Sequence, residues 1–315
     1  MKKEWQKGSS NLTGILILIV IITIIVLTPK NPSSSTSNVS WNYKVTNPGE
    51  SGESYTSNSG EERKTIESDV SLGTGNASYV YQPYEEYITI ENYGREAVNI
   101  TGWQLKNGKD ERSYNYGGEP QRFSADYATI PQAVPHISPM GVEFPQDVVL
   151  KDGERAIVTT GSVGVRTPYT ITSFKENICS GYIEALPDYA FTPPLNQSCP
   201  SPRLEPGVAN LDSECRAFIN TLSSCRTPEF NAKTPDGKGS CNTCVNGKIL
   251  SSSCAAFIKA HYSYQGCLAF HGKEPNFSGR TWRIFLGKSW EMWADEYETI
   301  ELYDRLGRLV DFQNY

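Results

Sequence analysis

Histidine is scarce in this sequence, and the common catalytic motifs are missing. His136, His261 and His271 are the three histidines among 315 residues, and none lies in an HExxH pattern. No G-x-S-x-G sequence is present either. Metalloproteases and α/β-hydrolases need those spacings to place a zinc-ligand pair or a nucleophile. We therefore expect no enzymatic activity, with His136 at the surface of a Pro-rich loop and His261 packed in an amphipathic helix.

Positive charge is also in short supply. The chain has 29 Lys and Arg against 35 Asp and Glu, a formal net charge of -6. A nucleic-acid-binding surface needs an excess of cations to neutralise phosphates, so we expect no nucleic-acid partner. The EF-hand spacing of carboxylates is absent. Asp295, Glu296 and Glu298 precede a predicted strand and are interpreted as a solvated edge, with calcium at the rim as the alternative; we expect no metal or cofactor.

Charge is absent altogether from residues 12–28, which read LTGILILIVIITIIVLT. At about 1.5 Å per residue this run covers roughly 26 Å, the length of a short transmembrane helix. A cleaved signal peptide is the alternative, but no A-x-A-like site follows the run. Lys2, Lys3 and Lys7 precede it, so the positive-inside rule predicts a cytoplasmic tail over residues 1–11. We expect a single-pass membrane protein whose C-terminal part is extracytoplasmic.

The cysteines are confined to one part of the chain. An even number of cysteines in a short exported stretch is typical of disulfides formed in an oxidising compartment. All eight are disulfide candidates: Cys179, Cys199, Cys215, Cys225, Cys241, Cys244, Cys254 and Cys267. The sequence leaves their pairing open. One interpretation is that Cys215, Cys225, Cys254 and Cys267 clamp two short helices together.

Cys241 and Cys244 form a C-x-x-C motif, which allows three interpretations. A structural disulfide is favoured, because the flanking Gly-rich sequence predicts a loop rather than the helix N-terminus that a redox pair needs. Thiol–disulfide exchange is the first alternative. Zinc is the second, with Cys254, His261 or Cys267 completing the ligands. The alternative function is therefore an exported enzyme, either a thiol–disulfide oxidoreductase or a metal-dependent hydrolase in this region.

Composition divides the rest of the chain. Residues 31–77 are rich in Ser, Thr, Asn, Gly and Glu and predict a flexible linker. Short alternating runs follow, and with frequent turn residues they predict an antiparallel β-sandwich over residues 79–315. The runs lie at residues 87–91, 97–105, 155–160, 282–286, 299–303 and 309–312.

Residues 174–278 differ in character from the runs on either side. They hold all the cysteines and two predicted helices, which begin near Asp212 and near Ser251, both of them residue types that favour N-caps. We interpret this region as a helical, disulfide-rich insertion in the sandwich. Insertions between scaffold strands often carry specificity, so it is expected to choose the ligand.

The two ends of the β region resemble the lamin-tail domain, an immunoglobulin-like β-sandwich. The similarity lies in residues 86–94 (EYITIENYG), residues 98–105 (VNITGWQL) and residues 295–304 (DEYETIELYD), and more weakly in residues 152–154. The resemblance implies that fold and a binding or tethering role, and it carries no catalytic residue. Trp103 is expected in the core, because Gly102 before it allows close backbone approach. The insertion is not part of the common domain.

Aromatic residues provide the remaining functional signal. Trp290 and Trp293 lie in a predicted loop close to the C-terminus and are predicted to form an exposed platform for a ligand, with core packing as the alternative. Together these observations predict a mainly β, membrane-anchored binding or scaffolding module at the cell surface. Its expected ligand is a protein or a glycan.

Overall fold

The computed structural model describes residues 54–56, 62–108, 113–116, 119–122, 125–139, 141, 143–163, 168–295 and 298–315. The predicted cytoplasmic tail, the predicted anchor over residues 12–28 and the first part of the predicted linker lie outside these ranges. Among the helices that the structure describes, none has the length and apolar character needed to cross a bilayer.

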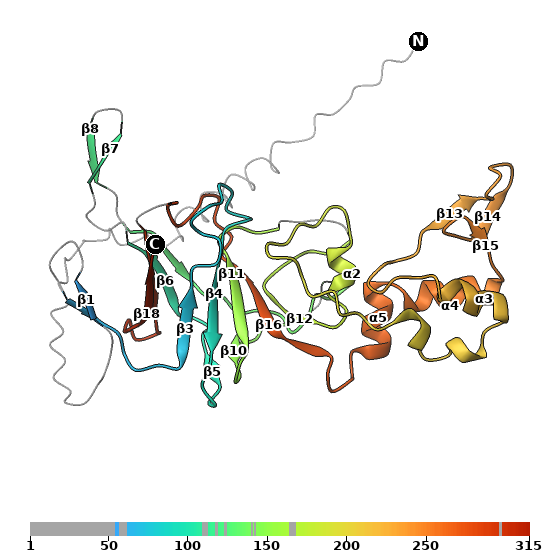
Figure 1. Cartoon of the computed structure of the whole chain (residues 1–315), viewed down its shortest axis with the longest axis horizontal. Helices are drawn as coiled ribbons and strands as arrows, with labels where there is room; N and C mark the ends of the chain where they lie inside the picture. Colours follow the sequence, from blue (N-terminus) through green and yellow to red (C-terminus); the bar gives the residue numbers. More distant parts are fainter. Residues whose placement is uncertain are drawn as a thin grey trace, which may run out of the picture. The chain divides into compact units, whose positions relative to one another are not determined.

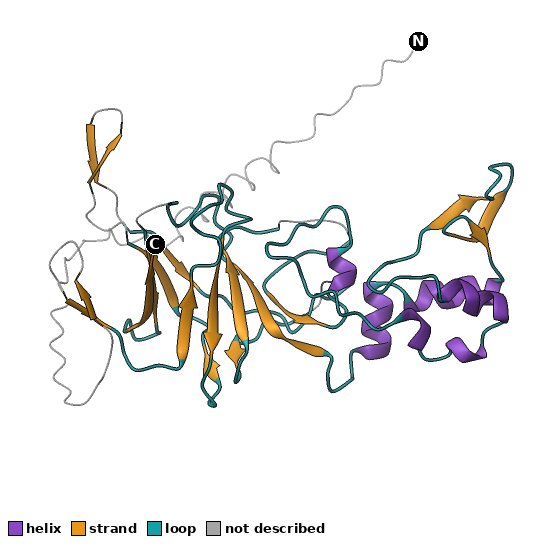
Figure 2. Ribbon diagram, in the orientation of Figure 1, coloured by secondary structure: helices purple, strands orange, loops and turns teal. Residues whose placement is uncertain are grey.

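The described chain is mainly β and contains several sheets (Figures 1 and 2). Two of the sheets share one hydrophobic core. The larger has the strand order β12 (Phe174–Asn177), β16 (Ser278–Phe285), β11 (Arg155–Thr159), β4 (Tyr87–Asn92) and β3 (Val70–Gly73). The smaller has the order β18 (Leu309–Asn314), β17 (Thr299–Tyr303), β6 (Gln104–Asn107) and β9 (Tyr127–Thr129).

The core follows from the alternation of apolar residues along the strands. In β4, Ile88 and Ile90 are fully buried while the residues between them are partly exposed. Leu105 of β6 and Ile300 of β17 belong to the same buried cluster. Successive side chains on a strand point to opposite faces, so each sheet buries one face against the other. Trp103 is buried in this core, as the sequence predicts.

One strand pair departs from the predicted antiparallel arrangement. β11 and β16 run parallel, with Ala156 opposite Trp282 and Val158 opposite Ile284. Parallel neighbours need a long crossover connection, and the chain between these two strands passes through β12 and the insertion. The larger sheet is therefore mixed, and the prediction of a purely antiparallel sandwich is wrong at this pair.

The prediction of a flexible linker up to residue 77 is wrong for its last part. β3 pairs with β4, and Val70 and Leu72 are buried in the shared core. Only two apolar residues are needed here because alternate positions of a strand face the core, so average composition hides the strand. A short pair precedes it, β1 (Ser54–Thr56) with β2 (Glu62–Lys64).

Two further two-stranded sheets complete this part of the described chain. They are β5 (Val98–Asn99) with β10 (Val149–Leu150), and β7 (Ser113–Tyr116) with β8 (Glu119–Arg122).

The insertion leaves the larger sheet between two neighbouring strands. β12 and β16 are antiparallel, and Asn177 at the end of β12 pairs with Ser278 at the start of β16. The two strands thus belong to the sheet, and the insertion itself covers residues 178–277. Figure 2 shows that the described helices are confined to it. They are α2 (Gly181–Glu184), α3 (Ser213–Ile219), α4 (Ser252–His261) and α5 (Tyr264–His271), with short 3-10 turns at Pro202–Leu204 and Val208–Asn210.

The helix starts agree with the sequence. Asp212 caps α3 by accepting a hydrogen bond from the Cys215 backbone N–H, and Ser251 caps α4 by accepting one from Cys254. Ser263 caps α5, a helix that the sequence analysis did not separate from α4. Such side-chain caps satisfy backbone donors that have no partner within the helix.

A three-stranded ribbon, which the sequence analysis does not predict, carries the C-x-x-C motif. β14 (Ser240–Val245) pairs with β13 (Phe230–Lys233) on one side and with β15 (Lys248–Ile249) on the other. The C-x-x-C motif is therefore on a strand, and the flanking residues predicted as loop form a bend at residues 237–239 and a turn at residues 246–247. Val245 and Leu250 fasten the ribbon to α3 and α4 by joining one buried cluster with Phe218 and Ile258. That long-range packing is invisible to local composition.

Candidate functional site

Exposed aromatic side chains gather at one end of the two sheets. They come from the loop between β3 and β4, from the start of β9 and from the loop after β16, and each is between 44% and 73% exposed. We call this set the aromatic end: Tyr79, Tyr81, Tyr84, Tyr127 and Trp290. In Figure 1 the loop before β4 and the loop after β16 lie together above the sheets. Single exposed aromatics are ordinary, whereas a group of them marks a candidate binding surface.

Hydrogen bonds through the buried Glu86 hold two of these loops together. Its carboxylate accepts hydrogen bonds from the backbone N–H groups of Met292, at 2.8 Å, and Trp293, at 3.2 Å. Burial raises the pKa of Glu86, and the nearby Glu291 carboxylate adds to that rise. Backbone bonds also join Gly161 to Pro83 at 2.5 Å and Lys288 to Thr160 at 2.9 Å. The loop that carries Tyr84 and the loop that carries Trp290 are thus both hydrogen-bonded to the turn that follows β11.

Trp290 is held in a fixed orientation although its ring is exposed. Its indole N–H donates to Asp126 at 2.6 Å, and the Lys288 ammonium donates to the other oxygen of Asp126 at 2.6 Å. Lys288 also donates to the Tyr127 carbonyl and lies 5.2 Å from the Trp290 ring centroid. Burial opposes ionisation of Asp126, but the hydrogen bonds from Lys288 and Trp290 outweigh it and lower the pKa of Asp126.

Trp293 does not join Trp290 at the surface. It is 2% exposed and belongs to the shared core, whereas Trp290 is 57% exposed. The predicted two-tryptophan platform is therefore wrong in its second member. Local context distinguishes the two residues, because Trp293 lies between Met292 and Ala294 while Trp290 lies between polar neighbours. The tyrosines of the β3–β4 loop were missed, since their segment was assigned to the linker or to the start of the fold.

The carboxylates near this end are not all solvated, contrary to the prediction. Glu298 is buried, and its side chain accepts backbone hydrogen bonds from Gly108 at 3.0 Å, Thr299 at 2.9 Å and Ala294 at 3.2 Å. A buried carboxylate needs such donors to offset desolvation. Glu298 therefore connects the loop after β6 to the start of β17. Asp295 is half-buried, and Glu296 lies outside the described residues.

All eight cysteines are paired in the structure. The four disulfides are Cys179–Cys267, Cys199–Cys225, Cys215–Cys254 and Cys241–Cys244. Cys215–Cys254 joins α3 to α4, so the two predicted helices are indeed clamped together. Cys225 and Cys267 serve other connections, because each pairs with a cysteine from the first part of the insertion.

These pairings argue against the two alternatives for the C-x-x-C motif. Cys254 and Cys267 are bonded elsewhere and cannot complete a zinc site with Cys241 and Cys244. Within the described ranges, no group of three or more His, Cys, Asp or Glu side chains is arranged to hold a metal ion. A reactive thiolate is usually stabilised by a helix N-terminus, whereas this pair lies on the central strand of a ribbon.

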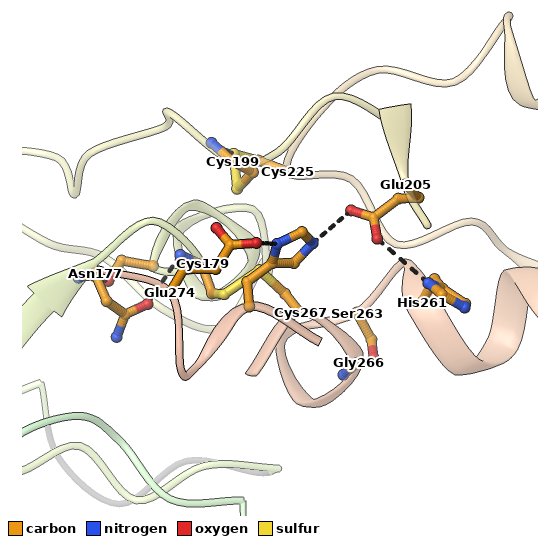
Figure 3. Close-up of a disulfide and its surroundings, with 12 residues drawn as sticks. Asn177, Cys179, Cys199, Glu205, Cys225, His261, Ser263, Gly266, Cys267 and Glu274 are labelled. Atoms are coloured by element: carbon orange, nitrogen blue, oxygen red, sulfur yellow. Dashed lines mark hydrogen bonds and ion pairs between the residues drawn. A yellow bond between two sulfur atoms is a disulfide. The ribbon is translucent and has the colours of Figure 1, made fainter. Parts of the chain in front are cut away.

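A chain of ion pairs crosses the insertion (Figure 3). Glu205 follows the first 3-10 turn and is buried. One of its oxygens lies 3.3 Å from Nδ1 of His261 on α4, and the other lies 2.9 Å from Nε2 of His271 on α5. Nδ1 of His271 lies 2.7 Å from Glu274. A single carboxylate thus ties the segment after Cys199 to two helices.

This geometry favours a charged His271. Both of its ring nitrogens face carboxylate oxygens, which accept hydrogen bonds when ionised, so both nitrogens must donate. Burial by itself would lower the pKa of His271, but the hydrogen bonds with Glu274 and Glu205 outweigh it and raise that pKa. His261 is stacked between Phe257, at 3.9 Å, and Phe270, at 3.7 Å. His261 packs in its helix as the sequence predicts. Both histidines are held by contacts within the insertion.

His136 is half-buried rather than free at the surface. Its Nε2 lies 3.3 Å from Glu143, and its ring meets Phe277 edge-on at 5.9 Å. None of the three histidines contacts another.

No protein-family model matches the chain. No curated protein matches it either.

Proposed function

We propose that this chain is a non-catalytic binding module, anchored in a membrane by residues 12–28 and displayed on the extracytoplasmic side. The aromatic end is its ligand-binding surface. The observation that carries this proposal is the grouping of Tyr84, Tyr127 and Trp290. The segments that bear them are held by the carboxylates of Glu86, which is buried, and Asp126, which is half-buried. Tyrosine and tryptophan dominate binding hot spots because they supply large contact area with few rotatable bonds.

The insertion was expected to choose the ligand, and the proposal moves that role to the aromatic end. β12 and β16 carry the insertion at Asn177 and Ser278, and the loop with Trp290 follows the other end of β16. The two regions thus leave the larger sheet at opposite ends. Disulfides and ion pairs hold the insertion together internally, and Arg283 of β16 ties it to the sheet through the carbonyls of Pro193 and Pro194. These contacts suit a rigid body more than an adaptable one.

The lamin-tail-like fold is part of the same proposal. The three resembling segments supply β4, β5 with the start of β6, and β17, and β6 lies next to β17. Trp103, the most specific residue of the resemblance, packs in the core that they share. Export is supported by the four disulfides, which persist in oxidising compartments, and by the uncharged run before the described residues.

A capture experiment tests the proposal. The full chain in detergent or nanodiscs is immobilised and exposed to solubilised envelope components. A Trp290→Ala/Tyr127→Ala variant is immobilised and treated in the same way. Truncating two hot-spot rings is expected to weaken retention at least about tenfold. Tyr93→Ala is the matched control, because Tyr93 is equally exposed but follows the other end of β4. Retention that is equal in all three proteins would refute the assignment of the surface.

Anchoring and export have separate tests. The full chain should stay with the membrane during alkaline extraction. Mass mapping without reduction should recover three disulfide-linked peptide pairs and one peptide that contains the Cys241–Cys244 disulfide. Eight free thiols in a soluble fraction would contradict both.

A further inference from the structure

We infer that the ligand of the aromatic end is an uncharged glycan, an inference that rests on the proposed function. The sugar rings would stack on the exposed faces of Trp290 and Tyr127, with hydroxyl groups reaching the polar atoms around them.

The exposed apolar groups at this end are all tyrosine or tryptophan. Among the described residues, the large exposed aliphatic side chains lie elsewhere, namely Leu204, Ile249 and Leu306. A protein partner usually buries a mixed apolar core together with such rings. A hexose instead offers a flat face of C–H groups and an edge of hydroxyls, which an aromatic ring with a polar tip matches on both counts.

Trp290 is oriented before any ligand arrives. Its indole N–H is bonded to Asp126, and Lys288 lies against one face of the ring while being bonded to Asp126 itself. More than half of the side chain nonetheless stays exposed. A ring that is already fixed loses little conformational freedom on binding. Tyr127 follows Asp126 directly in the chain, so the Tyr127 ring is positioned next to the residue that holds the Trp290 ring.

The charges at this end do not favour an acidic ligand. The ammonium of Lys288 is neutralised by Asp126 at 2.6 Å. Glu291 is close enough to Glu86 to raise its pKa, and half-buried Glu85 lies beside Glu86 in the chain. The ammonium of Lys106 also lies here, 5.6 Å from the Tyr127 ring centroid, and its charge is matched by those of Glu85 and Glu291. Uronate, sulfate or phosphate groups would therefore meet carboxylates without a surplus of cations to offset repulsion. Uncharged hexose chains meet no such repulsion.

The test uses the full chain in nanodiscs and three soluble probes: β-1,4-linked glucose and N-acetylglucosamine hexamers, which are uncharged, and an oligogalacturonate of similar length. Calorimetry and tryptophan fluorescence give the dissociation constants. Binding of at least one uncharged hexamer is expected, with Trp290→Ala weakening it about tenfold and Tyr93→Ala changing it less than about twofold.

The outcomes separate this inference from the proposed function. Binding to neither uncharged hexamer, with envelope capture that still depends on Trp290, would overturn the glycan and leave the binding module. Tighter binding of the oligogalacturonate would overturn the charge argument. Equal losses in Trp290→Ala and Tyr93→Ala would overturn the site. If neither hexamers nor envelope components depend on Trp290, both proposals fail.

Discussion

The Cys179–Cys267 disulfide closes nearly the whole insertion, since its two cysteines are 88 residues apart, whereas Cys241 and Cys244 are 3 apart. A crosslink stabilises a fold largely by restricting the unfolded chain, and its contribution grows with the logarithm of the loop that it closes. For these loops the entropic contribution is about 4.6 kcal/mol for the long crosslink and about 1.6 kcal/mol for the short one. Removing the first should therefore cost about 3 kcal/mol more free energy of unfolding.

Paired alanine substitutions make the comparison clean. Cys179→Ala/Cys267→Ala and Cys241→Ala/Cys244→Ala each remove one crosslink and leave no free thiol to mispair. Guanidinium unfolding is followed by far-UV circular dichroism, because the described helices all lie in the insertion. The midpoint should fall much further in the Cys179/Cys267 variant. An equal or greater loss in the Cys241/Cys244 variant would refute the loop-entropy reasoning and would show that the ribbon depends on its own crosslink.

Three further predictions concern the core shared by the two sheets and the ion-pair chain. The pKa of His271 is raised in the folded chain from its ordinary 6.5. Protonated His271 therefore stabilises the fold fully below about pH 6.5, and this stabilisation is lost as pH rises through the pKa of the folded chain. Denaturation midpoints should decline over that pH range, and His271→Gln should abolish the decline. Trp103→Ala should cost about 3–5 kcal/mol of unfolding free energy, and a loss below about 1 kcal/mol would contradict its burial. Val70→Asp should lower the melting temperature of the sheets, because it places a charge in their shared core. An unchanged melting temperature would restore the interpretation of this segment as a linker.

The sequence was most informative where a local pattern decides the structure. Alternation identified β4, β11, β17 and β18, and the capping residues Asp212 and Ser251 located two helices. The even cysteine count indicated disulfides. Each of these signals depends on residues that are close together in the chain, and so does the physics behind it.

The remainder depends on contacts between distant residues. The parallel pairing of β11 with β16 depends on where the insertion returns, and the burial of Glu298 depends on backbone donors near residues 108 and 294. Local sequence separates the exposed Trp290 from the buried Trp293. The carboxylate that bonds the backbone of Met292 and Trp293 belongs to Glu86, 206 and 207 residues away, and local sequence gives no sign of it. Such partners can be recognised only once the chain is folded.

The insertion begins and ends at one pair of neighbouring residues, Asn177 and Ser278. A hairpin turn could join those two positions and return the chain from β12 to β16 without altering the register of either strand. The sheet therefore provides a position at which one whole insertion can be replaced by another. A different insertion could be acquired there over evolutionary time, or by engineering, while the aromatic loops at the far end of β16 keep the strands that support them.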